Sequence, residues 1–424
     1  MQRALHSGPT TAQWRMILLA SLGGALEFYD FVVFGVFAPS IAAAFFPSAD
    51  PVVSQLLAFA GFASGYLARP LGGFVLAHFG DRLGRRRVFV GNVLAVSFAT
   101  LGMGLVPTYA TWGIAAPILL LALRLIQGFC LGGELPGALT YVAETAPARV
   151  SLVCGVVFAC VNSGVLLATL VSLLTQVAIP PDLLPGTGWR VAFVLGGALG
   201  LVGFKLRQAL EETPAFAEMR AQVARVPLRD VLATHLWPAL AGVALCATTA
   251  AFTGLLFVHM PGYLRGLGYD PKLVSVAQNA AVATLSVSLL GAAWLGDRLP
   301  RRPLMAVGAA VLLLGCWPWY AAVAGHALPL VPLLMLAALA AGPVTGTFGA
   351  VVADLFPTRL RFTGIAFSYN VAFTAFSGTA PLVATALIRL TGAPAAPALM
   401  MGVCAALALL GSLWIGRHGG RLGT

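Results

Sequence analysis

Apolar residues run in long blocks along this chain, and short polar stretches separate the blocks. A helix needs about 20 apolar residues to cross the hydrocarbon core of a bilayer, and these blocks are long enough. The pattern predicts twelve transmembrane spans, at residues 15–38, 53–78, 88–107, 114–140, 150–177, 189–209, 233–260, 272–295, 303–325, 327–352, 361–389 and 395–416. The longest polar stretch follows the sixth span. It divides the chain into a first six-helix bundle, a linker and a second six-helix bundle, at residues 1–207, 208–232 and 233–424.

Composition supports an all-α polytopic membrane protein. Hydrophobic residues make up 59% and charged residues 9%, against about 25% charged in soluble domains. This excludes a soluble enzyme, a nucleic-acid binder and a disordered scaffold. The net charge of +11 is typical of cytoplasmic loops rich in Lys and Arg. With a cytoplasmic amino terminus, 19 of the 25 Lys and Arg residues fall in the termini and inner loops, so both termini are predicted to be cytoplasmic.

The chain also contains a repeat. GDRLGRRR at 80–87 follows the second span, and GDRLPRR at 296–302 follows the eighth. An acid-x-x-Pro-x-Arg pattern follows the fourth span at 144–149 and the tenth at 354–359. Two motifs that recur in order, six spans apart, indicate two parallel halves. Duplicated membrane halves with the site between them are an architecture of transporters.

The repeated loops are candidate gating elements. Asp81 can accept hydrogen bonds from a helix N-terminus or pair with an arginine, and Gly84 permits close backbone approach. We favour a latch that opens and closes during transport over a simple anchor of positive charge. The predicted gating residues are Asp81, Arg82, Gly84, Arg85, Asp297 and Arg298.

Charged side chains within the spans are the main candidates for the chemistry. Each costs roughly 2.5–3.5 kcal/mol or more at the bilayer centre. Glu27 and Asp30 lie three residues apart on one face of the first span. Two carboxylates so close do not both ionise easily, so one can carry a proton. The alternative is a static ion pair with Arg69 or Arg124.

Arg69 is the first candidate for binding a substrate anion, because a buried arginine can grip a carboxylate with two hydrogen bonds. Its alternative role is counter-ion to Asp30. Arg124, in a Gly-lined face of the fourth span, is a second substrate candidate. Glu134 is assigned to proton coupling, with a structural or gating role as the alternative. Uncharged groups that can line a cavity are Thr249, Tyr369 and Asn370.

Several segments resemble the major facilitator superfamily, and within it the metabolite:proton symporters for citrate, α-ketoglutarate, shikimate and proline/betaine. They are the loop at 80–87, ALEFYDFVVFG at 25–35, ARPLGG at 68–73, RLIQGFCLGGE at 124–134, LEETPAF at 210–216 and FPTRLR at 356–361. The resemblance implies twelve helices in two bundles, alternating access, and a place in the bacterial cytoplasmic membrane. It also relates Arg124 to proton coupling.

The predicted function is import of a small organic anion, a di- or tricarboxylate, with protons. Two arginines within the spans favour an anion, and so does the short polar tail after Arg417, because osmosensing proline/betaine carriers have a long charged extension. A zwitterion carrier and a proton/drug antiporter are the alternatives. The six cysteines lie in apolar runs without metal-ligand spacing, so neither an enzyme nor a metal or other cofactor is expected. We expect a monomer in the lipid bilayer, with organic acid and protons as its only partners and no nucleic acid.

Overall fold

The structure is a computed structural model, and it describes residues 9–83, 85–208 and 227–418. Its first half begins where Thr10 and Gln13 cap each other's backbone N–H groups in a capping box, which fixes the start of the first helix. The helices described in this half are α1 (Thr11–Val36), α2 (Ala38–Phe45), α3 (Pro51–Leu83), α4 (Arg85–Leu105), α5 (Tyr109–Trp112), α6 (Ala115–Leu131), α7 (Glu134–Thr145), the 3-10 turn η2 (Pro147–Arg149), α8 (Val150–Ala178) and α9 (Leu184–Gln208).

The second half repeats the arrangement of long apolar helices. Its described elements are α11 (Pro227–Thr234), α12 (Leu236–Phe252), η3 (Thr253–His259), α13 (Met260–Gly266), α14 (Pro271–Gly296), α15 (Arg301–Ala324), α16 (Leu330–Ala353), α17 (Thr358–Ala372), η4 (Phe373–Gly378), α18 (Ala380–Thr391) and α19 (Pro397–His418). Most of the predicted linker at 208–232 lies outside the described residues, so the domain boundaries stay a prediction.

The predicted spans correspond to helices of the structure. Within the described residues, eleven helical stretches are long and apolar enough to cross a membrane. The remaining predicted span, 88–107, corresponds to α4, whose apolar part is the shorter Gly91–Leu105. Basic residues of the preceding loop form the first turn of α4, so its apolar part is shorter than the helix.

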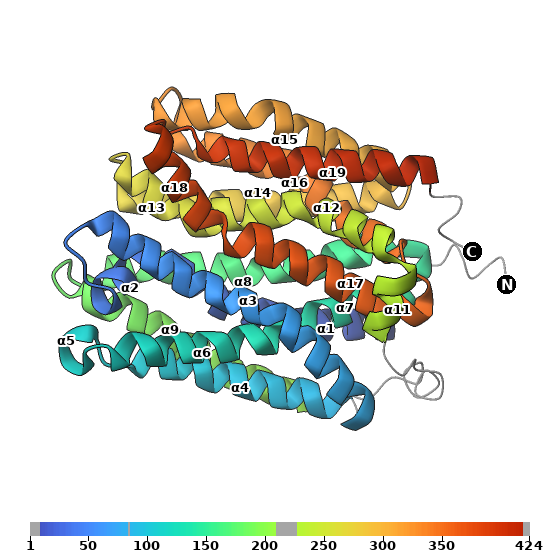
Figure 1. The fold of residues 1–424 in the computed structure, drawn as a ribbon, viewed down its shortest axis with the longest axis horizontal. Coiled ribbons are helices and arrows are strands. Elements are labelled where there is room, and N and C mark those ends of the chain that lie inside the picture. Colours follow the sequence, from blue (N-terminus) through green and yellow to red (C-terminus); the bar gives the residue numbers. More distant parts are fainter. Residues whose placement is uncertain (1–8, 84, 209–226, 419–424) are drawn as a thin grey trace.

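The long helices run side by side in two groups, one from each half of the sequence (Figure 1). Within the first group α1 packs on α8, α3 on α6 and α4 on α9; within the second, α14 packs on α16 and α15 on α19. The groups meet along a seam where α8 contacts α14, and where α3 contacts α17 and η4. The start of α1 and the end of α19 lie at the same end of the molecule. We call this the terminal end and the other the opposite end.

Two spans of the second half contain a π-helical segment, η3 and η4. Each is followed within three residues by a proline, Pro261 or Pro381. Proline has no N–H to donate to the carbonyl four residues earlier, and its ring pushes that carbonyl away. The turn before the proline is therefore widened, and such π-bulges are frequent at functional sites.

Glycines bring α3 and α6 into direct backbone contact. A Cβ atom on Gly128 would overlap the carbonyl oxygen of Gly65, and one on Gly132 would overlap that of Arg69. Small residues permit this close approach in membrane helices. The predicted Gly-lined face of the fourth span is confirmed, and it fixes the position of Arg69 relative to α6.

Candidate functional site

Arg69 lies inside α3, at the seam between the two halves, and only 1% of its surface is exposed. Its guanidinium carbon lies 4.3 Å from the ring centroid of Tyr66, one turn earlier, and 5.6 Å from that of Phe28 on α1. Tyr369 on α17 lies near it from the other half, close enough for an electrostatic interaction. The buried cation therefore lies against two aromatic rings of the first half, with Tyr369 of the second half nearby.

Side chains of the eleventh span cross the seam beside Arg69. Asn370 donates its Nδ2 hydrogen to the carbonyl oxygen of Gly132 at 2.7 Å, and Thr374 donates its hydroxyl hydrogen to that of Tyr66, also at 2.7 Å. Neither acceptor carbonyl receives the usual hydrogen bond from an N–H group four residues later in its own helix. Gly132 stands at the break between α6 and α7, and the residue four positions after Tyr66 is Pro70, which has no N–H.

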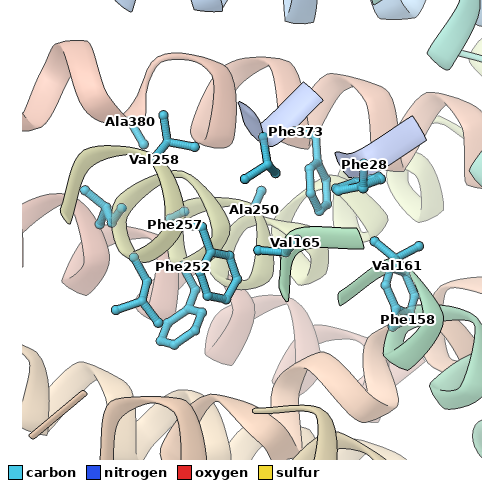
Figure 2. Close-up of a cluster of buried hydrophobic side chains, with 14 of the residues drawn as sticks. Phe28, Phe158, Val161, Val165, Ala250, Phe252, Phe257, Val258, Phe373 and Ala380 are labelled. Carbon is cyan, nitrogen blue, oxygen red and sulfur yellow. The ribbon is translucent and has the colours of Figure 1, made fainter. Parts of the chain in front are cut away.

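The rest of the seam around these groups is filled by apolar side chains. Figure 2 shows Phe28 of α1 next to Phe373 of η4, and Val161 and Val165 of α8 lie in the same cluster. All are buried. Thr249 on α12 is 4% exposed, and its hydroxyl has no hydrogen-bond partner among the described residues. Arg69, Tyr369 and Asn370 thus come together across the seam, as a substrate site requires.

Arg124 lies elsewhere, inside the first half. It is fully buried, with its guanidinium 4.6 Å from the ring centroid of Phe34 and 5.1 Å from that of Phe62. Its Nη1 donates to the Oε1 of Gln127. Its assignment to the substrate stays a prediction, and these contacts are with residues of its own half.

The predicted carboxylates occupy different places. Asp30 is 2% exposed in α1 and accepts a hydrogen bond from the hydroxyl of Thr100 at 3.1 Å. Glu134 is 3% exposed and begins α7. The side chain of Glu27 lies outside the described residues. Thr100 was not among the predicted residues, because a lone threonine in an apolar helix usually bonds its own backbone.

The loop at 296–302, which contains the predicted gating residues Asp297 and Arg298, reaches across the seam at the terminal end. Oδ1 of Asp297 accepts from the backbone N–H of Ser151 at 2.9 Å, and Oδ2 accepts from that of Leu152 at 3.1 Å. A carboxylate at the start of α8 is stabilised by these N–H groups and by the helix dipole. Arg301 lies 3.7 Å from Asp297 and 2.8 Å from Asp354. An ion pair across the seam joins Arg361 and Glu144 at 3.3 Å.

Other predicted gating residues are placed differently. Arg298 stacks on Trp294 of its own half, with the guanidinium carbon 3.5 Å from the ring centroid. Gly84 and the side chains of Asp81, Arg82 and Arg85 lie outside the described residues. Arg301, which is part of the repeated motif, was not among the predicted residues. It pairs with two acidic side chains, Asp297 and Asp354, next to the contact with α8.

The halves also touch at the opposite end. Arg389 pairs with Asp50 at 3.0 Å. Gln176 donates to the hydroxyl of Ser275 at 3.0 Å, and Thr169 donates to Oδ1 of Asn279 at 2.9 Å. Contacts at both ends, with an apolar filling between them, make this an occluded arrangement in which Arg69 is closed off from both sides.

Comparison with known proteins decides the family. The sequence pattern of the Major Facilitator Superfamily matches residues 20–367. The chain belongs to this superfamily. It is 33% identical to the proline/betaine transporter of Escherichia coli strain K12 over 416 residues, which cover 93% of this chain and 82% of that protein. It is 30% identical to the citrate-proton symporter of Klebsiella pneumoniae over 414 residues, which cover 95% and 91%.

Solved structures show the same fold. The xylose transporter XylE from E. coli, in a partially occluded inward-open conformation, superposes with a TM-score of 0.75 at 18% identity over 96% of this chain and 98% of that one. The predicted twelve-helix, two-bundle architecture and the resemblance to this superfamily are confirmed. The chain is a polytopic membrane transporter and not an enzyme.

Proposed function

We propose that this transporter imports a small carboxylate-bearing metabolite together with protons across the bacterial cytoplasmic membrane. The observation that carries the proposal is Arg69, a buried and permanently charged group at the seam where the eleventh span meets α3. A fixed cation at mid-depth is costly unless it is used. Arginine binds carboxylate through charge-assisted, bidentate hydrogen bonds.

The substrate candidates are a small organic anion, as the two arginines within the spans suggest, and a zwitterion. The zwitterion is supported by the rings of Tyr66 and Phe28 against Arg69, because such faces also attract an organic cation. One curated relative is named for citrate and another for proline and betaine. For a di- or tricarboxylate, Arg124 would have to join Arg69 in binding; for a zwitterion, Arg69 alone suffices.

Proton coupling is assigned to the carboxylates of the first half, Glu27, Asp30 and Glu134. The contacts at the two ends of the seam support alternating access. In this proposal, release of the contacts at the terminal end opens the site to one side, and separation at the opposite end opens it to the other. With the termini in the cytoplasm, the latch of Asp297 faces inward. Import is then the direction that an inward proton gradient drives.

The test is uptake into proteoliposomes under an imposed inward pH gradient, with labelled citrate, other di- and tricarboxylates, proline and betaine. Accumulation of one compound that a protonophore abolishes is the expected result. Accumulation that survives the protonophore would refute proton coupling, and extrusion from loaded vesicles would identify an antiporter. Transport of betaine but of no anion would select the zwitterion candidate.

Arg69 has its own test, by equilibrium binding of the transported compound. Removing one partner of a buried charge pair typically costs about 2–5 kcal/mol. Arg69→Lys should weaken binding strongly, and Arg69→Ala should weaken it more. If Arg69 only neutralises Asp30, the double change of Arg69→Ala with Asp30→Ala should restore binding. A restored double variant would remove Arg69 from the site.

A further inference from the structure

Four polar side chains form a continuous chain of hydrogen bonds inside the first half. Nη1 of Arg124 donates to Oε1 of Gln127, and Nε2 of Gln127 donates to Oγ1 of Thr100 at 2.9 Å. Thr100 in turn donates its hydroxyl hydrogen to Oδ2 of Asp30 at 3.1 Å. The members come from α6, α4 and α1, so the chain joins three helices of one bundle.

Every bond in this chain points from the cation to the carboxylate. Arginine can only donate, so it fixes the amide of Gln127 with its oxygen toward α6 and its NH₂ group toward α4. The oxygen of Thr100 then accepts from that NH₂ group, and its single hydrogen is left for Asp30. An ionised carboxylate can only accept. The arrangement therefore suits the ionised form of Asp30.

The chain is isolated from solvent. Arg124, Gln127 and Thr100 are fully buried and Asp30 is 2% exposed. Charge-assisted hydrogen bonds are roughly twice as strong as neutral ones, and a low local dielectric strengthens them further. Close packing holds the carboxylate in place, because a Cβ atom on Gly196 of α9 would overlap its Oδ1.

Other ionisable groups lie on α1 and on the helices that pack against it or against the chain. They include Glu27 and Tyr29 on α1, Tyr66 and Arg69 on α3, Arg124 on α6, Glu134 on α7 and Arg190 on α9. The hydroxyl of Tyr29 donates to the carbonyl of Ala192 at 2.9 Å, so it is occupied. Gly164 of α8 faces the backbone of Tyr29, and Gly196 of α9 faces Asp30 itself. The segment η3 is apolar except for His259 and Thr253 at its two ends. The hydrogen-bond chain thus ties Arg124 to the carboxylate through Gln127 and Thr100.

We propose that Thr100 and Gln127 are positioning residues that set the proton affinity of Asp30. The inference rests on the proposed proton-coupled function. A proton that binds Oδ2 of Asp30 turns this oxygen into a donor, and the hydroxyl hydrogen of Thr100 then turns toward the carbonyl of its own helix four residues earlier. Proton loading thus reverses one bond of the chain and weakens the tie between α1 and Arg124.

The experiment measures initial uptake against external pH in proteoliposomes at fixed internal pH. Thr100→Val removes the hydrogen-bond donor to the ionised carboxylate, so Asp30 should keep its proton up to a higher pH. The pH at which uptake is half-maximal should rise by about one unit. Gln127→Leu should shift it in the same direction. Thr100→Ser keeps the hydroxyl and should restore the wild-type midpoint. The matched control is Thr140→Val, at a threonine that is 2% exposed and donates to the carbonyl of Pro136 in its own helix.

A second readout does not depend on transport. The infrared band of the protonated carboxyl, titrated in purified protein and assigned by its loss in Asp30→Asn, should show the same rise in Thr100→Val and Gln127→Leu. Unchanged midpoints in both variants, or equal shifts in Thr100→Ser or Thr140→Val, would overturn the inference. If the wild-type protein shows no proton-dependent uptake but the infrared midpoint moves as expected, the proposed function fails and the role of the two residues in setting the proton affinity of Asp30 stands.

Discussion

Replacing Asp297 by Asn tests whether a helix cap across the seam holds the terminal end closed. The carboxylate of Asp297 is fully buried, and its two oxygens accept hydrogen bonds from consecutive N–H groups at the start of α8, at 2.9 and 3.1 Å. Asparagine keeps the shape and one acceptor oxygen. It loses the negative charge and turns an NH₂ group toward one of the two backbone donors.

The expected cost follows from these contacts. A hydrogen bond to a charged group contributes about 1.5–3 kcal/mol, and a carboxylate at a helix N-terminus adds about 0.3–1 kcal/mol. The substitution removes one bond and the charge from the other, so the closed arrangement should lose about 2–4 kcal/mol. At about 1.4 kcal/mol per factor of ten, the ratio of closed to open molecules should fall about 30- to 700-fold.

Cys154 is a natural reporter of this opening. It lies one turn after Ser151 on α8 and is 1% exposed. Its Cβ atom faces Gly349 of the second half, where an added Cβ would lie 3.4 Å away. In a variant that keeps Cys154 and replaces the other five cysteines, its alkylation by a small maleimide measures the open population. Asp297→Asn should speed this reaction at least tenfold in purified protein.

The matched control is Asp354→Asn, which removes the other acidic partner of Arg301. The side chain of Asp354 is 60% exposed, and exposed pairs contribute about 0–1 kcal/mol. Its effect should stay below about fivefold. An unchanged alkylation rate in Asp297→Asn, or equal acceleration by the two variants, would refute the assignment of the buried cap as the latch.

Three further outcomes are expected. Gly128→Ala should lower the thermal unfolding temperature or prevent folding, because its Cβ overlaps a carbonyl oxygen of α3; an unchanged temperature would contradict this. His259→Phe should stabilise by about 1–3 kcal/mol, because neither ring nitrogen of the buried imidazole has a hydrogen-bond partner among the described residues; a lower unfolding temperature would argue otherwise. Glu144→Gln removes the part-buried ion pair with Arg361 and should speed Cys154 alkylation less than about fivefold. The difference in alkylation rate between variant and wild type should shrink in high salt. A larger, salt-independent effect would show that this pair is part of the latch itself.

The fold could be predicted because each transmembrane span is a local run of apolar residues. The interruptions of the helices inside these spans could not be predicted from hydropathy. The fourth predicted span, 114–140, is divided at Gly132 and Gly133 between α6 and α7. Both residues are apolar enough to continue a span, and only the contact with α3 shows why the helix stops there. The π-helical turns before Pro261 and Pro381 depend likewise on how a proline is accommodated, which hydropathy does not record.

The charged residues of the candidate site could be predicted from the sequence. Arg69 and Asp30 stand out because charge is rare in apolar spans. Their partners do not stand out, since Thr100 and Thr374 look like ordinary helix threonines until the packing of distant helices is known. The reach of Asp297 to the start of α8 is a contact between residues 145 and 146 positions apart. No local pattern encodes such a distance, although the repeated motif marks the residue that makes it.

The distribution of charge explains how the two halves can separate. The six predicted spans of the second half contain no Asp or Glu, and Arg and Lys occur only at their ends. Neutral hydrogen bonds between described residues cross the seam at mid-depth, from Asn370 to Gly132 and from Thr374 to Tyr66. Each contributes about 0.5–1.5 kcal/mol.

The ion pairs described across the seam, Arg361 with Glu144 and Arg389 with Asp50, lie at its two ends, where water can replace the lost partner. Breaking a buried ion pair in the low-dielectric centre would instead leave two uncompensated charges, at about 3–5 kcal/mol. Arg124 and Asp30 are linked within one bundle, so in the proposed alternating-access cycle their charges would stay compensated. The proposed charged chemistry thus lies in the first half, and the second half covers it with neutral groups whose release in the proposed cycle costs little free energy.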